Sequence, residues 1–263
     1  MNFEKNAQLY KTVRKPDERL TSKIVELLEL PKGSVIADIG AGTGNYSVEL
    51  FNCGYEVFAI EPCHAMMSQC ENVNIKWIKS YAEQIELSNA TVDGAVVINA
   101  IHHFHDVKKA ITEIYRIMKH GTLLIFTFDP IILKKVWLYD YWDALHDYVD
   151  KAYLPILDII LNIESIFKNK VEEIVFELPP DFKDGFFTSF WKNPFLLLNE
   201  NIRQANSTYT SMENEYAKNG LQRLSIELSN GIWANKYSSI LNLSLYDVGC
   251  RILRCKKPMD SKG

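Results

Sequence analysis

The chain has 263 residues, of which 47% are hydrophobic and 24% are charged, and its formal net charge is −4. This length and composition fit one large globular α/β domain that needs no disulfides for its stability. The negative charge argues against nucleic acid as the main partner, because proteins that bind DNA or RNA present a basic surface.

Short apolar runs alternate with helical patterns through the first half of the chain. A helix is predicted over residues 17–30, where Pro31 and Gly33 end it. Strands are predicted after it at 34–39, 55–60, 74–79, 94–99 and 122–128, with helices between them at 46–53, 65–71 and 106–118. Strands that alternate with helices in this way indicate βαβ units, and therefore a parallel sheet that is covered on both faces.

The second half is richer in aromatic residues and less regular. Residues 131–167 have an aromatic, helical pattern, and a strand is predicted over 172–178. A helix is predicted around 217–228 and a last strand over 248–253. We therefore predict an α/β fold: a doubly wound, mostly parallel sheet of seven strands with a helical, aromatic-rich cap, in a single domain over residues 1–263.

A glycine-rich loop is the most informative motif. The strand at 34–39 ends in Gly40-Ala41-Gly42-Thr43-Gly44 and runs into a helix. Glycine is required where a ligand lies against bare backbone or where φ is positive, and the helix that follows directs unpaired N–H groups at the loop. The spacing differs from the G-x-G-x-x-G pattern of dinucleotide sites, and the carboxylate of Asp38 beside the loop suits a cationic amine better than a pyrophosphate.

Three further segments follow strands of the same sheet. Glu61 ends the second strand, where an acid can accept hydrogen bonds from ribose hydroxyls. Residues 80–83 follow the third strand and residues 99–104 follow the fourth. Open α/β sheets bind ligands at the carboxyl ends of their strands, so these segments together predict a nucleoside-binding site.

On these motifs the chain resembles the class I methyltransferases that use S-adenosylmethionine, over its whole length and most specifically from Ile36 to Pro130. The resemblance implies a Rossmann-like methyltransferase fold with a cofactor-binding core at about 20–130. It assigns the cap and substrate-facing segments to about 131–235 and the last strand to about 248–255. The implied reaction transfers a methyl group from S-adenosylmethionine to an O, N or C nucleophile of a small-molecule acceptor, leaving S-adenosylhomocysteine. Residues 180–186 and 190–194 resemble a bacterial subgroup with unsettled substrates.

The resemblance also implies roles for single residues. Asp38 and the glycine loop would hold the methionyl part, Glu61 the ribose, and Ala82 with Glu83 the adenine. Tyr81 stands where the family often has Asp. The full set expected at the cofactor is Tyr10, Arg14, Asp38, Gly40, Ala41, Gly42, Asn45, Glu61, Pro62, Met66, Tyr81, Ala82, Glu83, Asn99, Ala100 and Phe104.

Several of these assignments have alternatives. Tyr10 and Arg14 precede the helix at 17–30, where similar members have a lid, but Arg14 can equally be a solvated surface residue. His103 is the candidate general base, against a role in lining the pocket. No metal site is expected, because the adjacent His102 and His103 cannot point the same way.

The aromatic segments supply the candidate substrate contacts. Trp142, Phe187 and Trp191 are assigned to the acceptor, although aromatic residues at helical spacing are more often core. Asp184 pairs with Lys183, caps the next helix or binds substrate.

Two other functions stay open, a nicotinamide-dependent oxidoreductase and a catalytically silent S-adenosylmethionine-binding protein. The chain shows no secretory signal, no stretch of about 18 apolar residues and no C-x-x-C pair among its five cysteines. We therefore expect a cytoplasmic protein with reduced thiols and no membrane partner, as a monomer or weak homodimer.

Overall fold

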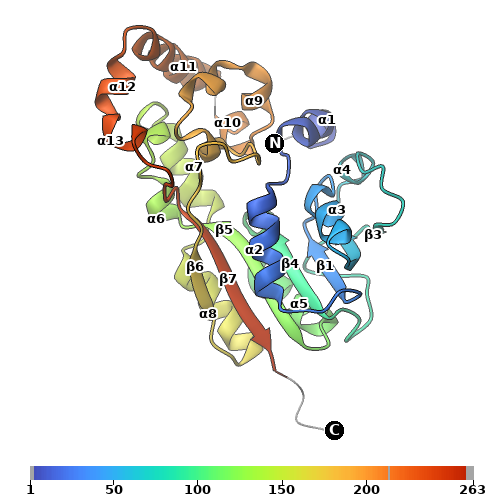
Figure 1. The fold of residues 1–263 in the computed structure, drawn as a ribbon. Helices are drawn as coiled ribbons and strands as arrows, with labels where there is room; N and C mark the ends of the chain where they lie inside the picture. Colours follow the sequence, from blue (N-terminus) through green and yellow to red (C-terminus); the bar gives the residue numbers. More distant parts are fainter. Residues whose placement is uncertain (1–2, 213, 259–263) are drawn as a thin grey trace.

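A seven-stranded sheet forms the centre of the computed structural model, which describes residues 3–212 and 214–258 (Figure 1). The strand order is β3-β2-β1-β4-β5-β7-β6, and β7 is antiparallel to both of its neighbours while the other pairs are parallel. The predicted fold class is therefore confirmed. The strands are β1 (Val35–Ile39), β2 (Glu56–Ile60), β3 (Lys76–Ile78), β4 (Gly94–Ile98), β5 (Gly121–Phe128), β6 (Glu172–Val175) and β7 (Cys250–Lys257).

Helices cover both faces of the sheet. On one face lie α2 (Glu18–Leu28) and α3 (Asn45–Asn52), and on the other lie α5 (Val107–Ile117) and α8 (Ile156–Phe167). Successive residues of β5 alternate between the two cores: Leu124 packs with the α2 side and Ile125 with the α5 side. Burial on both faces explains why the strands are continuous apolar runs in the sequence.

The helix α5 shows how the sequence dictates a local structure. Ala110, Ile111, Ile114 and Ile117 recur at three- and four-residue steps, and all of them are fully buried. The helix begins at Asp106, whose side chain accepts a hydrogen bond from the backbone N–H of Lys109.

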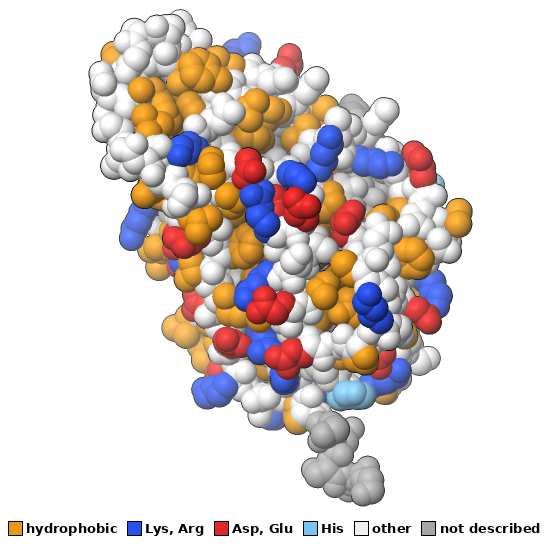
Figure 2. Space-filling view, viewed as in Figure 1, with side chains coloured by type: hydrophobic (Ala, Val, Ile, Leu, Met, Phe, Trp, Pro, Cys, Tyr) orange, Lys and Arg blue, Asp and Glu red, His pale blue; other side chains and the backbone are white. Residues whose placement is uncertain are grey.

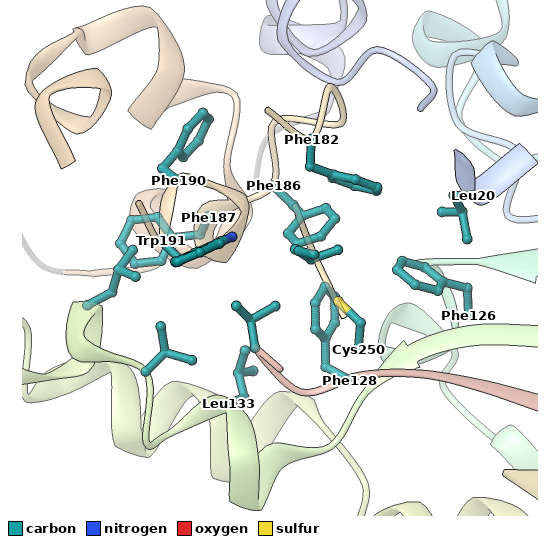
Figure 3. Close-up of a cluster of buried hydrophobic side chains, with 14 of the residues drawn as sticks. Leu20, Phe126, Phe128, Leu133, Phe182, Phe186, Phe187, Phe190, Trp191 and Cys250 are labelled. Atoms are coloured by element: carbon teal, nitrogen blue, oxygen red, sulfur yellow. The ribbon is translucent and has the colours of Figure 1, made fainter. Parts of the chain in front are cut away.

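The cap lies beyond the end of the sheet at which β7 begins (Figure 1). This is the carboxyl end of β5, because Cys250 pairs with Phe128. Figure 3 shows part of its aromatic core, in which the ring of Phe186 lies near that of Phe128, with 5.1 Å between their centres. The cap helices are α6 (Pro130–Leu133), α7 (Ala144–Ala152), α9 (Glu200–Gln204), α10 (Ser207–Thr210), α11 (Asn214–Ser229), α12 (Ile232–Lys236) and α13 (Ser238–Leu241).

Three features differ from the sequence-based expectations. A helix α1 (Phe3–Val13) was not predicted, and it contains Tyr10. The helix expected at 65–71 is the single turn α4 (His64–Met67). Within the segment assigned to the cap, α8 and β6 pack on the sheet, because β6 pairs with β7 and α8 contacts both α5 and β7.

On the face shown in Figure 2, basic and acidic side chains are interspersed and do not separate by sign. Within residues 3–212 and 214–258, no helix is both long and apolar enough to cross a bilayer. All five cysteines are free thiols.

Candidate functional site

A cavity of about 320 Å³ opens at the carboxyl ends of β1, β2 and β4. Its position is the one that open α/β sheets use for ligands, and its volume lies in the range of small-molecule sites. The lining residues are Tyr10, Arg14, Gly40, Ala41, Gly42, Thr43, Asn45, Tyr46, Ile60, Glu61, Pro62, Cys63, Met66, Ser80, Tyr81, Ala82, Glu83, Ile98, Asn99, Ala100, His103, Phe104, His105 and Asp184.

The glycine loop forms one wall and brings bare backbone to the cavity. Gly40 has a φ of +73°, and a Cβ there would lie 2.5 Å from the Cβ of Ala100. Gly42 has a φ of +58°, and a Cβ there would occupy the space between Met66 and Tyr10. Gly40 therefore needs to be glycine because a Cβ would clash with the segment after β4, whereas Gly42 is favoured as glycine by its positive φ.

Glu61 holds the loop from the end of β2. Its carboxylate accepts the backbone N–H of Gly42 at 2.9 Å through Oε2 and that of Cys63 at 2.9 Å through Oε1. Burial raises the pKa of Glu61, while these two N–H groups oppose the rise by stabilising the charged form. Each oxygen keeps a second lone pair, so the carboxylate can also accept hydroxyl groups of a ligand.

Asp38, which the sequence places at the cofactor, does not line the cavity. Its side chain is 2% exposed and lies behind the loop, where it accepts the Ser47 hydroxyl at 2.5 Å. Burial raises the pKa of Asp38 to about 6, the Ser47 hydrogen bond opposes the rise and the charge of Glu61 adds to it. The residue therefore links β1 to α3 beneath the loop.

This raised pKa predicts a pH-dependent stability. The folded state binds more protons at Asp38 than the unfolded state, whose aspartate titrates near 3.9, so the free energy of unfolding should fall between about pH 4 and pH 6 and then level off. The fall is up to about 3 kcal/mol, and Asp38→Asn should remove it while keeping the contact with Ser47. Urea unfolding of both proteins across this pH range measures the difference, and equal slopes in the two would contradict the prediction.

The segment after β4 carries the polar groups expected near the reacting centre. Asn99 has a φ of +52°, which is rare for a residue other than glycine, and its Oδ1 is buried without a hydrogen-bond partner. His103 is exposed at the cavity wall, where the loss of part of its surrounding water lowers the pKa of its imidazole. His103 is therefore neutral at pH 7.

A buried ion pair lines the cavity. Arg14 Nε lies 2.5 Å from Asp184 Oδ1, and the side chains are 9% and 2% exposed. Tyr46 donates its hydroxyl to Asp184 Oδ2 at 3.2 Å, and the Arg14 guanidinium lies over the Tyr10 ring, 5.0 Å from its centre. Arg14 and Asp184 also form an antiparallel bridge, so this pair fastens the segment after α1 to the cap.

The structure thus brings the expected cofactor residues together around one cavity, apart from Asp38. It adds residues that the sequence did not single out there: Thr43, Tyr46, Ile60, Cys63, Ser80, Ile98, His105 and Asp184. Most of these are neighbours of motif residues in the sequence. Asp184 had been considered only as a partner of Lys183, a helix cap or a substrate contact.

The three residues expected at the substrate do not lie together in the structure. Phe187 lines a second cavity of about 30 Å³, which shares Tyr10, Arg14, Asn99 and His103 with the first. Trp142 and Trp191 line neither cavity, because both are in the cap core at 1% and 0% exposure. The indole N–H of Trp142 donates to the carbonyl of Ala217 at 3.1 Å. These two tryptophans shape the cap and do not face the site.

A metal site is not evident in the described part of the chain, where no group of three or more His, Cys, Asp or Glu side chains could hold an ion. His102 packs against the ring of Tyr153, 4.6 Å between centres.

Comparisons with known proteins agree with this geometry. A family model described as a methyltransferase domain matches residues 37–126. The structure of a putative methyltransferase from an antibiotic biosynthesis pathway of Anabaena variabilis is 39% identical, with a TM-score of 0.88 over 92% of this chain and 98% of that one.

More distant relatives share the domain or the fold. A malonyl-[acyl-carrier protein] O-methyltransferase of Yersinia pestis is 24% identical over 127 residues, 48% of this chain and 48% of its own length. A phosphoethanolamine N-methyltransferase of Haemonchus contortus, solved with phosphomonomethylethanolamine and S-adenosylhomocysteine, has a TM-score of 0.60 at 15% identity over 97% of this chain and 58% of that one, which shows the fold alone. The chain spans about half the length of the curated relatives it matches.

The relative from Anabaena variabilis is matched over nearly its whole length at 39% identity, and the matched domain contains the glycine loop, Glu61 and Asn99. The chain belongs to the class I S-adenosylmethionine-dependent methyltransferases.

Proposed function

We propose that this protein binds S-adenosylmethionine in the larger cavity and transfers its methyl group to a nucleophile of a small-molecule acceptor. One observation carries the proposal: the Glu61 carboxylate and the bare backbone of Gly40 to Gly42 border the same cavity at the carboxyl ends of the strands. An acid and a glycine loop in this arrangement suit a nucleoside that carries an amino-acid tail.

The lining fits each part of that ligand. Glu61 has free lone pairs for two ribose hydroxyls, and the Gly40 and Gly42 backbone leaves room for the methionyl part. Ala82 supplies an apolar surface for the adenine, beside Glu83. The Glu83 carboxylate accepts the backbone N–H of His105 at 2.7 Å and so stabilises the segment after β4 in the cavity wall.

Methyl transfer from a sulfonium requires mainly that the protein position the two reactants. A methyl group on a sulfonium is already activated, so holding the nucleophile in line and excluding water can supply much of the rate. In this proposal the Arg14–Asp184 pair and the Tyr10 ring, which line the cavity, help to exclude water from it.

In this proposal His103 lies where the two cavities meet. Its neutral imidazole can accept a proton from the acceptor.

Calorimetric titration with S-adenosylmethionine, S-adenosylhomocysteine and NAD, in parallel, tests the cofactor. We expect micromolar binding of the two sulfur nucleosides and none of NAD. Binding of NAD alone would favour a nicotinamide-dependent oxidoreductase and overturn the proposal. Binding without methyl transfer to any acceptor would instead indicate a silent S-adenosylmethionine-binding protein.

A further inference from the structure

The strand order determines which part of a nucleoside meets each side of the larger cavity. The glycine loop follows β1, Glu61 follows β2 and residues 80–83 follow β3, and the three strands are neighbours in the order β1, β2, β3. β3 is the edge strand on this side of the sheet (Figure 1). With the ribose on Glu61 and the methionyl part at the loop, the base therefore lies on the β3 side of the cavity.

The loop side and the β3 side of the cavity differ in their exposure to solvent. On the loop side, the cavity is lined by the buried pair of Arg14 and Asp184, and Asp184 accepts the hydroxyl of Tyr46 at the start of α3. On the β3 side, Tyr81 is 57% exposed and the side chain of His105 is 79% exposed, and both line the cavity. Their rings contact each other edge to face, with 5.9 Å between the centres. One edge of a bound base would therefore lie beside solvent.

The buried polar side chains on the β3 side hold backbone groups of the protein. Glu83 Oε1 accepts the backbone N–H of His105 at 2.7 Å and that of Asp106 at 3.2 Å, which turns this carboxylate toward the segment before α5. The Ser80 hydroxyl accepts the backbone N–H of Glu86 at 3.5 Å. Both acceptors therefore stabilise the wall of the cavity, and the side chain between them in the sequence, Tyr81, extends into solvent.

The exocyclic amine at position 6 of adenine carries two N–H donors, and a protein can recognise it only with an acceptor. A site that buries an acceptor against this amine rejects an analogue without it, because the acceptor is then left unpaired. At an edge beside solvent, water accepts hydrogen bonds from the amine both before and after binding. The amine then adds little to the affinity.

We infer that the cofactor site does not discriminate at position 6 of the purine, which faces solvent beside Tyr81. The inference rests on the proposed function and adds the class of nucleosides that the site accepts. These are S-nucleosides of the S-adenosylmethionine type in which the 6-amine is missing or carries a substituent. Specificity for the cofactor then resides in Glu61, which binds the ribose, and in the glycine loop beside the methionyl part.

Calorimetric titration of the full chain with matched nucleosides tests this inference. S-adenosylhomocysteine is compared with its 6-deamino analogue, in which hydrogen replaces the amine, and with its N6-benzyl analogue. Both analogues keep the ring nitrogens of adenine as acceptors, and both should bind within about threefold of S-adenosylhomocysteine. The 2′-deoxy analogue is the positive control: it lacks a hydroxyl that Glu61 would accept, so it should bind about tenfold or more weakly.

Two exposed tyrosines provide a matched pair of variants. Tyr81→Asp places a carboxylate beside position 6 and should introduce discrimination, with S-adenosylhomocysteine bound about tenfold or more tightly than the 6-deamino analogue. Tyr216→Asp makes the same substitution in α11, at a residue that is 60% exposed and lines neither cavity, and should leave the two affinities within about threefold of each other. Binding of S-adenosylhomocysteine by both variants also shows that they fold.

The outcomes separate this inference from the proposed function. If S-adenosylhomocysteine binds but the 6-deamino or the N6-benzyl analogue binds tenfold or more weakly, a protein acceptor or a closed wall meets position 6, so the inference is overturned and the proposed methyl transfer stands. A Tyr81→Asp variant without the expected preference overturns the placement of position 6 beside Tyr81. If S-adenosylhomocysteine itself does not bind, the proposed function fails and the inference fails with it.

Discussion

Glu61→Gln is expected to weaken binding of S-adenosylhomocysteine by about 100-fold, because two hydrogen bonds from ribose hydroxyls to a charged acceptor are lost or weakened. The substitution is not conservative at this position. Both carboxylate oxygens already accept backbone N–H groups, from Gly42 and Cys63. The amide NH₂ of glutamine must therefore face one of these donors, which leaves that donor unpaired and displaces the loop.

Calorimetry on the purified variant measures this loss, with Glu56→Gln as the control. Glu56 begins the strand β2, which Glu61 follows, but the Glu56 side chain is 56% exposed and pairs with Lys76 at the surface. The control should bind like the wild type. An affinity of Glu61→Gln within about threefold of the wild type would show that Glu61 does not bind the ribose.

Asp184→Asn is expected to lower the free energy of unfolding by about 3–5 kcal/mol. The substitution removes the counter-charge of Arg14, whose side chain is only 9% exposed, so a buried cation is left unpaired. It also weakens the acceptor for the Tyr46 hydroxyl and loosens the bridge between the segment after α1 and the cap. Urea unfolding at pH 7 measures the change.

Asp181→Asn is the matched control for this prediction. Asp181 pairs with Arg19 at 2.7 Å, but its side chain is 78% exposed, so its loss should cost at most about 1 kcal/mol. The double variant Arg14→Met with Asp184→Leu should recover stability relative to Asp184→Asn, because it leaves no buried charge. A loss in Asp184→Asn no greater than in Asp181→Asn would show that the buried pair contributes little.

The sequence predicted the sheet well because its strands and helices carry strong local patterns. The spacing of Ala110, Ile111, Ile114 and Ile117 defines α5 to within two residues. The ranges predicted for β3 (74–79) and α4 (65–71) are longer than the observed strand and helical turn. Each segment has too few apolar positions to mark where it begins and ends. The helix α1 was not predicted, although Phe3, Ala7, Tyr10 and Val13 stand at helical spacing in its sequence.

The sequence predicted those residues of the candidate site that directly follow strands. Gly40, Glu61 and Asn99 follow strands whose carboxyl ends meet at one edge, so the topology brings them together. The Arg14–Asp184 contact was not predictable, because 170 residues separate the partners and no local pattern links them. Composition also could not place Trp142 and Trp191 in the core instead of the pocket, since the same side chains serve both roles.

The late position of β7 has a consequence for how the chain folds as it leaves the ribosome. This strand pairs with β5 along residues 121–128 and with β6, so it fills the gap between them. Roughly 120 residues separate the end of β5 from the start of β7, which at a synthesis rate of 5–20 residues per second is a delay of about 6 to 24 seconds. During that interval the emerging chain carries β5 with one edge open, a surface prone to pairing with other chains. Nascent chains arrested before Cys250 should therefore recruit chaperones, and those arrested well beyond Lys257 should release them.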